Sequence, residues 1–374
     1  MRTLWIALCV VAFAFPVSAQ ELVPDTIEYS RAEVVTVHSS EERLIPGTDT
    51  PATYQEITVR ILDGAETGKE VQLSNDYLAL DEGDVFYLSR TTNTADGTDY
   101  YTIGDPYRLP WLFGLACVFL AVVAVFGGKQ GMRGILSLGA GIAVIIGVLL
   151  PAIQTGYSPV LVSVGVTSLI VIIGSYVTHG VSRMTTTAVL GMIATIVLTG
   201  ILAHFSLLLT QLTGFTGDES TYLHLNSRGE LDLLGLLLGG ILIGLIGVMY
   251  DAAIGQSVAV EELYAANPSS TGKHVYLRAL RIGREHIGAL VNTLAIAYVG
   301  ASLPLLLLFY GDSVSWLVTL NREIFAAEIV RILVSSIGVI LVVPITTALA
   351  VLLLAGSKNR DNKPDSIGHL HHHV

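Results

Sequence analysis

The sequence predicts an α-helical polytopic membrane protein with about seven transmembrane helices and a small N-terminal extracytoplasmic all-β domain. Of the 374 residues, 52% are hydrophobic and 14% are charged, whereas soluble domains carry about 25% charged residues. Long apolar runs begin at Trp111 and recur almost to the C-terminus. The stretch before Trp111 is instead polar and acidic, with short runs rich in Val, Ile, Thr and Tyr.

Residues 1–19 have the composition of a signal peptide. Arg2 precedes a short apolar run from Leu4 to Phe15, and Val17-Ser18-Ala19 suits signal peptidase. The apolar run is short for a membrane span, so a cleaved signal peptide is favoured over an uncleaved anchor. Both interpretations export the segment that follows.

Residues 20–108 are predicted to form the extracytoplasmic β-rich domain. Gly- and Asp-containing turn signals separate five strand-like runs, at residues 32–38, 54–62, 69–73, 85–90 and 99–103. Their number and length are typical of a small barrel or sandwich of OB-fold size. Asp81, Glu82 and Asp84 could bind Ca²⁺, but they lack EF-hand spacing, and a solvated turn is the preferred interpretation.

Residues 109–356 are predicted to form the transmembrane helical domain, and residues 357–374 a cytoplasmic tail. The expected spans are Trp111–Phe126, Ile135–Leu150, Val160–Val177, Thr186–Leu209, Leu233–Tyr250, Ile287–Phe309 and Ile329–Ala355. The first three are short for a bilayer that needs about 20 residues per helix. His369 and His371 to His373 in the tail could hold a metal ion, but an exposed tail without a structural role is the simpler interpretation.

The distribution of basic residues predicts the orientation. If the N-terminal domain lies outside, the inner connections and the tail contain ten basic residues: Lys129, Arg133, Arg183, Lys273, Arg278, Arg281, Arg284, Lys358, Arg360 and Lys363. The outer connections contain three: Arg228, Arg322 and Arg331. This excess agrees with the positive-inside rule, which places the C-terminus in the cytoplasm.

The fifth predicted span carries a glycine face that ends in carboxylates. At about 100° per residue, Gly240, Gly244, Gly247, Asp251 and Glu262 fall on one side of the helix. Small residues let a partner helix approach closely, and acidic groups near bilayer depth usually face protein or water. Asp251 is therefore a candidate binding residue, with a simple helix end at the membrane interface as the alternative.

Other polar residues extend this candidate site. Gln256 follows Asp251 on the same helix, and Asn292 lies in the sixth predicted span beyond the basic run that includes Arg281 and Arg284. A buried asparagine can bridge helices or contact a ligand. Both roles remain open for Asn292.

The segment leading into the last span supplies the remaining candidates. Glu328 and Arg331 are one helical turn apart and are expected to pair. Glu323 lies in the segment 313–329, which is apolar enough to re-enter the membrane, as in many pores and transporters. An ordinary amphipathic surface helix is the alternative.

These stretches resemble the YibE/F-like family of bacterial multi-pass membrane proteins. The resemblance is carried by Asp251 with Gln256 and Glu262-Leu263, by the runs from Leu280 to Ile287 and from Val291 to Pro304, and by Asn321-Arg322-Glu323, Ala327 to Arg331, Ser336-Ile337-Gly338 and Pro344-Ile345-Thr346. Two positions depart from the family pattern, which often has Asp at the place of Glu285 and Gly at the place of Ser335. The resemblance implies a multi-pass membrane protein with an extracytoplasmic front domain, and it supplies no catalytic residues.

The preferred function is a transporter or channel for ions or a small charged solute. In this hypothesis Asp251 and Glu328 bind a cation or proton, and Asn292 adds an oxygen ligand. Arg331 modulates the pKa of Glu328. Gln256, Glu262 and Glu323 complete the candidate set. No cofactor and no nucleic-acid partner are expected; the partners are the lipid bilayer, the unknown solute and, through the glycine faces, a second copy of the chain.

Two other classes of function are compatible with parts of the sequence. The chain could be a membrane assembly or signalling component whose exported β-domain binds a partner while the basic run Lys273 to Arg284 meets anionic lipid or a cytoplasmic protein. An intramembrane hydrolase is disfavoured, because Tyr250-Asp251 lacks the second Asp in a later Gly-x-Gly-Asp span, and no HExxH or Walker A motif exists. We therefore expect no enzymatic activity.

Overall fold

The computed structural model describes residues 26–45, 47–76, 78–94, 97–311 and 314–355. The predicted signal peptide and the predicted cytoplasmic tail with its histidines lie outside the described residues. The chain divides into two compact units, with the boundary between Phe119 and Leu120. Each unit is described by itself.

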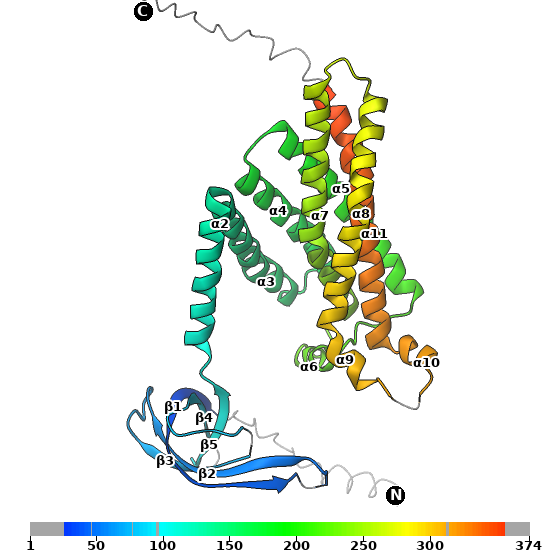
Figure 1. The fold of residues 1–374 in the computed structure, drawn as a ribbon. Coiled ribbons are helices and arrows are strands. Elements are labelled where there is room, and N and C mark those ends of the chain that lie inside the picture. The colour runs from blue at the N-terminus through cyan, green and yellow to red at the C-terminus, as the bar shows by residue number, and fades with distance from the viewer. Residues whose placement is uncertain (1–25, 46, 77, 95–96, 312–313, 356–374) are drawn as a thin grey trace, which may run out of the picture. The chain divides into compact units, whose positions relative to one another are not determined.

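The first unit contains one antiparallel sheet of five strands in the order β3-β2-β1-β4-β5 (Figure 1). The strands are β1 (Thr26–Leu44), β2 (Pro51–Ile61), β3 (Glu70–Asn75), β4 (Val85–Thr92) and β5 (Asp99–Pro106). All five predicted strands are confirmed, and β1 is longer than expected because it pairs with both β2 and β4. The return of β4 to the side of β1 makes a Greek key.

The core of the sheet follows from the alternation of side chains along each strand. Val34, Ile57, Phe86 and Leu88 are among the residues with at most 2% of their surface exposed. The acidic turn from Asp81 to Asp84, for which a Ca²⁺ site was the alternative prediction, is held by a hydrogen bond within the turn. Within it, Asp84 accepts a hydrogen bond from its own turn, at the Asp81 backbone nitrogen 2.8 Å away.

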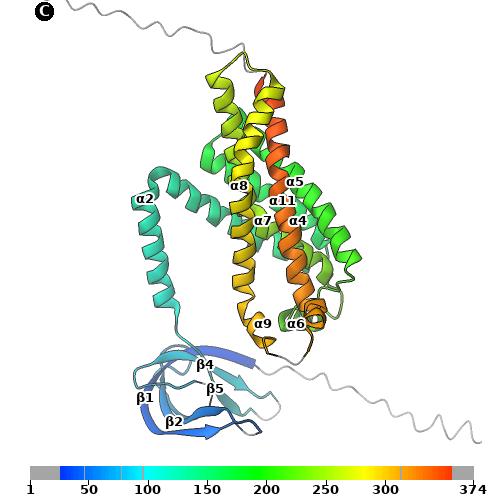
Figure 2. The same ribbon diagram turned by 45° about the vertical axis from the view of Figure 1, so that its right-hand side comes forward.

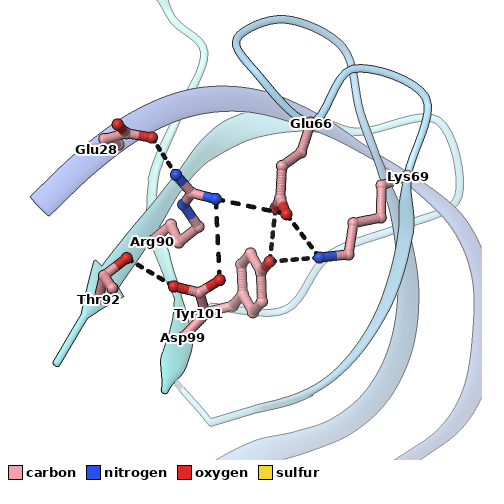
Figure 3. Close-up of polar contacts among 7 residues, drawn as sticks. All are labelled: Glu28, Glu66, Lys69, Arg90, Thr92, Asp99 and Tyr101. Atoms are coloured by element: carbon pink, nitrogen blue, oxygen red, sulfur yellow. Dashed lines mark hydrogen bonds and ion pairs between the residues drawn. The ribbon is translucent and has the colours of Figure 1, made fainter. Parts of the chain in front are cut away.

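A charged network continues the inward face of the sheet where the apolar core ends (Figure 3). The Tyr101 hydroxyl of β5 donates to Glu66 Oε2 at 2.6 Å and accepts from Lys69 Nζ at 2.8 Å. Arg90 NH1 lies 3.4 Å from Glu66 Oε1, and Arg90 also pairs with Glu28. The network links β5 to the turn before β3, so it joins the two edge strands of the sheet.

The connection from the sheet to the first helix is very short. Tyr107 still donates its backbone N–H to the Val85 carbonyl at 2.8 Å, and Leu112 donates to the Arg108 carbonyl at 3.0 Å. Helix α2 (Leu109–Val144) therefore begins directly after the sheet. Arg108 alone separates the last residue bonded to the sheet from the first residue of the helix.

The second unit is helical. It contains the rest of α2, the π-helix η1 (Ile145–Leu149), α3 (Leu150–Gln154), α4 (Pro159–His179), α5 (Arg183–Leu209), α6 (Asp218–Asn226), α7 (Leu233–Ala266), α8 (Gly272–Ala301), α9 (Leu303–Leu308), α10 (Trp316–Asn321) and α11 (Glu323–Leu354). Side-chain caps begin two of the long helices: Ser182 accepts from the Thr185 N–H, and Asp232 from the Gly235 N–H.

Five helical stretches in the described part of the chain are long and apolar enough to cross a membrane: Leu109–Gln154, Pro159–His179, Arg183–Leu209, Leu233–Ala266 and Glu323–Leu354. The first is 46 residues long and contains the first two predicted spans. It is interrupted at Gly128, whose φ of 52° and ψ of −142° are not helical. The sixth predicted span falls on α8 and α9, which are not among these five stretches. The number of seven spans therefore stays a prediction, as does the location of the sheet on the outer side of the membrane.

Helices α5 and α11 contact each other through two reciprocal glycine–threonine pairs. Gly191 of α5 lies against Thr346 of α11, and Gly338 of α11 lies against Thr199 of α5. A Cβ added at Gly338 would lie 2.7 Å from Thr199 Oγ1. The pairs run in opposite directions along the two helices, so α5 and α11 are antiparallel and closely packed, as small residues allow in membranes.

We predict that replacing Gly338 by Ala destabilises the helical unit, because the new Cβ overlaps Thr199. Overpacking of this kind costs about 1–3 kcal/mol. The measurement is the thermal unfolding midpoint of the purified protein in detergent. Gly165→Ala in α4 is the control, since a Cβ there meets nothing within 4 Å. Adding Thr199→Ala to Gly338→Ala should restore the midpoint; if it does not, the two residues are not in contact.

We also predict that acid weakens the sheet through Glu66. Hydrogen bonds from Lys69 and Tyr101 lower the pKa of Glu66, so its contribution to stability is present above the unfolded pKa of about 4.3 and is lost as the pH falls through the lower folded value. The near-ultraviolet circular dichroism of the tyrosines should report an unfolding midpoint that drops below pH about 4. Glu66→Gln should lower the midpoint at neutral pH and reduce its dependence on acid, whereas Glu41→Gln should change neither.

Candidate functional site

A pocket of about 310 Å³ lies where α7, α8 and α11 meet. These three helices run next to one another in both ribbon views (Figure 1 and Figure 2). Asp251 of α7 and His286 of α8 bring the titratable groups. The other residues that line the pocket are Ala252, Gly255, Gln256, Ile282, Gly283, Ala289, Leu290 and Val343. The pocket therefore combines one carboxylate, one imidazole and one amide with mostly apolar walls.

Gln256 is the buried polar residue of this pocket, with 4% of its surface exposed. The Thr347 hydroxyl of α11 lies 2.8 Å from Gln256 Oε1 and 2.6 Å from the carbonyl oxygen of Val343, one turn earlier. Gln256 is thus fixed at its oxygen by α11. Its Nε2 finds no acceptor among the described residues.

Gly283 lets α8 reach this junction. A Cβ added at Gly283 would lie 2.5 Å from Val343 Cγ1 and 2.6 Å from Gln256 Nε2. A larger residue at this position would therefore push α8 away from both α7 and α11. The close approach places Ile282 and His286 on the pocket wall.

The predicted glycine face of α7 is exposed within this chain. Gly240 and Gly247 have no atom within 4 Å of an added Cβ, whereas Gly244 lies directly against the Tyr298 hydroxyl of α8. The glycine that packs closely inside the unit is the neighbouring Gly239, against Ser163 of α4. The predicted face is therefore open at Gly240 and Gly247 and covered by Tyr298 at Gly244.

Glu328 and Arg331 form the expected pair. Arg331 NH1 lies 2.9 Å from Glu328 Oε1, and its Cζ lies 5.9 Å from the centre of the Tyr298 ring. Arg331 Nε and the Tyr298 hydroxyl are buried and have no hydrogen-bond partner in the described part of the chain. This second polar group joins α8 and α11, away from the pocket.

The Glu323 carboxylate binds the loop that follows α5. Its Oε1 accepts from the backbone N–H groups of Thr213, Gly214 and Phe215 at 2.7, 2.7 and 3.2 Å. Gly214, at φ +93°, is needed there because a Cβ would lie 2.6 Å from the Leu233 backbone. Glu323 therefore fastens the loop after α5 to the start of α11. Its carboxylate already holds several donors.

Glu262 and Asn292 lie outside both polar groups. Both are exposed, and neither makes a hydrogen bond or ion pair with another described residue. Asn292 does not bridge helices within this chain, because α8 turns its opposite side toward α7 and α11. Of the residues predicted from sequence, Asp251 and Gln256 come together at the pocket, while Glu328 and Arg331 come together at the second group.

Sequence reasoning missed His286 as a pocket residue. Its spacing from Ile282 and Ala289, four and three residues along α8, is the helical signal that could have found it. His179, at the end of α4, is a second missed neighbour: its ring lies 5.8 Å from that of Tyr250, the residue before Asp251. No group of three or more His, Cys, Asp or Glu that could hold a metal ion occurs in the described residues.

Comparison with known proteins agrees with the resemblance seen in the sequence. The model of the YibE/F-like protein family matches residues 115–356. The chain belongs to the YibE/F-like family. The matched part of this YibE/F-like chain includes the pocket and the Glu328–Arg331 pair, while the β-sheet precedes it. Searches of curated proteins and of solved structures found no match.

We predict that Glu323→Ala destabilises the helical unit, because three backbone donors lose their acceptor. A hydrogen bond contributes about 0.5–1.5 kcal/mol. The loss should come mainly from the part-buried Gly214 N–H, since water reaches the exposed Thr213 and Phe215, and thermal unfolding in detergent will measure it. Hydrogen exchange should rise in the loop 213–215 and at the start of α11. Glu219→Ala in α6, an exposed carboxylate, is the control. Unchanged exchange in the loop would show that the contact is dispensable.

Proposed function

We propose that the helical unit binds a small cationic solute in the pocket between α7, α8 and α11 and moves it across a membrane. One observation carries the proposal: the Asp251 carboxylate lines a pocket and, although His179 interacts with it electrostatically, it forms no ion pair within 4 Å among the described residues. A charged group at such a position in a membrane helix usually marks a solute or ion pathway.

The second polar group, around Glu328 and Arg331, supports a pathway with two polar positions for the solute. Tyr298, Glu328 and Arg331 lie on two of the three helices that form the pocket. Tyr298 is twelve residues beyond His286 on α8, or roughly 18 Å along the helix axis. A solute released from the pocket would therefore meet a second polar group at a different depth.

Helix α11 contains a proline at which the helix can bend as the solute moves between the two polar positions. Pro344 interrupts its hydrogen bonding next to Val343, a pocket residue. Proline removes a backbone donor and is a common place for a helix to bend. A bend there would change the distance between α11 and Gly283 of α8 and so open or close the pocket.

The proposal includes a bacterial inner-membrane location, with the β-sheet outside and the C-terminus in the cytoplasm. The excess of basic residues in the predicted inner connections supports this orientation. The arrangement would put the pocket toward the cytoplasmic ends of α7 and α8, and the Glu328–Arg331 pair toward the outside.

We predict that Asp251→Asn abolishes solute flux. The experiment reconstitutes wild-type and variant proteins in liposomes and screens protons, monovalent and divalent cations, small organic cations and anions by solid-supported-membrane current. Current through Asp251→Asn should fall to that of protein-free liposomes, because the neutral amide no longer attracts a cation.

Glu261→Gln is the matched control, since Glu261 is an exposed carboxylate on the same helix outside the pocket. All proteins are first checked for folding by gel filtration. Absence of current in the wild type for every solute, or equal current in Asp251→Asn and wild type, would contradict the proposal.

A second candidate function is that the β-sheet binds a partner in a membrane assembly. Ile27 and Tyr100 are both paired with Thr91, on opposite sides of β4, and Tyr29 lies two residues further along β1. Their exposed fractions are 54%, 54% and 71%. Alternate residues of a strand face the same side, so these side chains form one exposed apolar surface.

We predict that a photo-crosslinking residue placed at Tyr29 in cells yields a discrete adduct, because this surface would be covered by the partner. The same residue placed at Leu44, which is 62% exposed at the far end of β1, is the control. Equal adducts at both positions would argue against a specific partner.

A further inference from the structure

The pocket offers few ligands for an inorganic cation. Asp251 supplies a carboxylate, and Gln256 Oε1 is held by the Thr347 hydroxyl, which also lies against the Val343 carbonyl. His286 adds a nitrogen, whereas Ca²⁺ and Mg²⁺ prefer oxygen. Ca²⁺ takes about six to eight oxygen ligands, and Mg²⁺ an octahedral set. The remaining walls are mostly carbon, from Ala252, Ile282, Ala289, Leu290 and Val343. A dehydrated metal ion would therefore find too few oxygen atoms.

The size of the pocket points the same way. Its volume of about 310 Å³ is much larger than a bare ion and lies at the lower end of the roughly 300–1,000 Å³ typical of sites for small organic molecules. Apolar walls stabilise a ligand that carries a carbon skeleton. The occupant should thus be an organic cation.

The Gln256 amide adds a second requirement. Gln256 is 4% exposed and lines the pocket, and its Nε2 has no acceptor among the described residues. Nε2 is not among the buried side-chain atoms without a partner, so its N–H faces the open pocket, where water reaches it. A ligand that fills the pocket displaces this water: a ligand with an acceptor restores the hydrogen bond of Nε2, while a ligand without one leaves the N–H unsatisfied.

We propose that the pocket binds a small organic ammonium compound that also carries a hydrogen-bond acceptor. The ammonium group pairs with Asp251, the carbon atoms pack against Ile282, Leu290 and Val343, and the acceptor receives the N–H of Gln256. This inference rests on the proposed function, since it names the class of solute for that pocket. The same chemistry occurs in a free amino alcohol and in the headgroup of an aminophospholipid.

The test compares ethanolamine with n-propylamine, which have the same number of heavy atoms and differ in the acceptor. Binding to full-length protein in detergent is measured by calorimetry and by thermal shift. The wild type should bind ethanolamine about tenfold more tightly, as expected for one hydrogen bond to a donor that loses its water when the pocket is filled. Gln256→Leu should bind both amines equally, and Asp251→Asn should lose both. Glu261→Gln should behave as the wild type.

Several results would overturn the inference: stabilisation by NaCl or MgCl₂ equal to that by the amines, a preference for n-propylamine, or an ethanolamine preference that survives in Gln256→Leu. Gel filtration confirms that each variant is folded. Phosphatidylethanolamine and phosphatidylglycerol are then added to the micelles in parallel. Displacement of ethanolamine by phosphatidylethanolamine alone supports the inference with a lipid headgroup as the source, and displacement by neither lipid supports it with a free amine.

Binding and flux separate the two proposals. Amine binding without any current in liposomes would contradict transport and leave the ammonium site standing. A current of inorganic cations that depends on Asp251, without amine binding, would leave transport standing and overturn the ammonium site.

Discussion

Close approach of helix backbones at glycines that face polar side chains holds the helical unit together. Gly191 meets Thr346, Gly338 meets Thr199, and Gly283 meets Gln256. In a bilayer there is no hydrophobic force between apolar helices, so dispersion contacts at short distance and weak polar contacts provide the stabilisation. Each contact needs both partners, because a larger residue at the glycine would separate the helices.

The same constraint creates the candidate site. Since Gly283 brings α8 against Gln256 and Val343, the next turn of α8 places His286 beside the pocket that Asp251 lines. Packing and binding thus depend on one junction of three helices. The Gln256 amide meets Thr347 of α11 on one side and the pocket on the other.

Local patterns in the sequence predicted much of the architecture. The five strands followed from runs rich in Val, Ile, Thr and Tyr between turn signals, and the pairing of Glu328 with Arg331 followed from their spacing of one turn. Long-range partners could not be predicted. Glu323 was predicted as a candidate binding residue of the segment 313–329, but its hydrogen-bond donors come from Thr213 to Phe215, which are 108 to 110 residues away in the chain. Periodicity also found the glycine face of α7 without showing that Gly239, about 100° around the helix from Gly240, is the residue that packs on α4.

The single residue between the sheet and α2 has a mechanical consequence. Tyr107 is hydrogen-bonded to β4, and Leu112 is bonded to Arg108 within the first turn of the helix. A flexible linker would absorb a pull on the sheet by changing its own length. Here the connection is a single residue, Arg108, so it has little length to give before a pull on the strands reaches the first turn of α2. A force applied to the β-sheet would therefore act directly on α2.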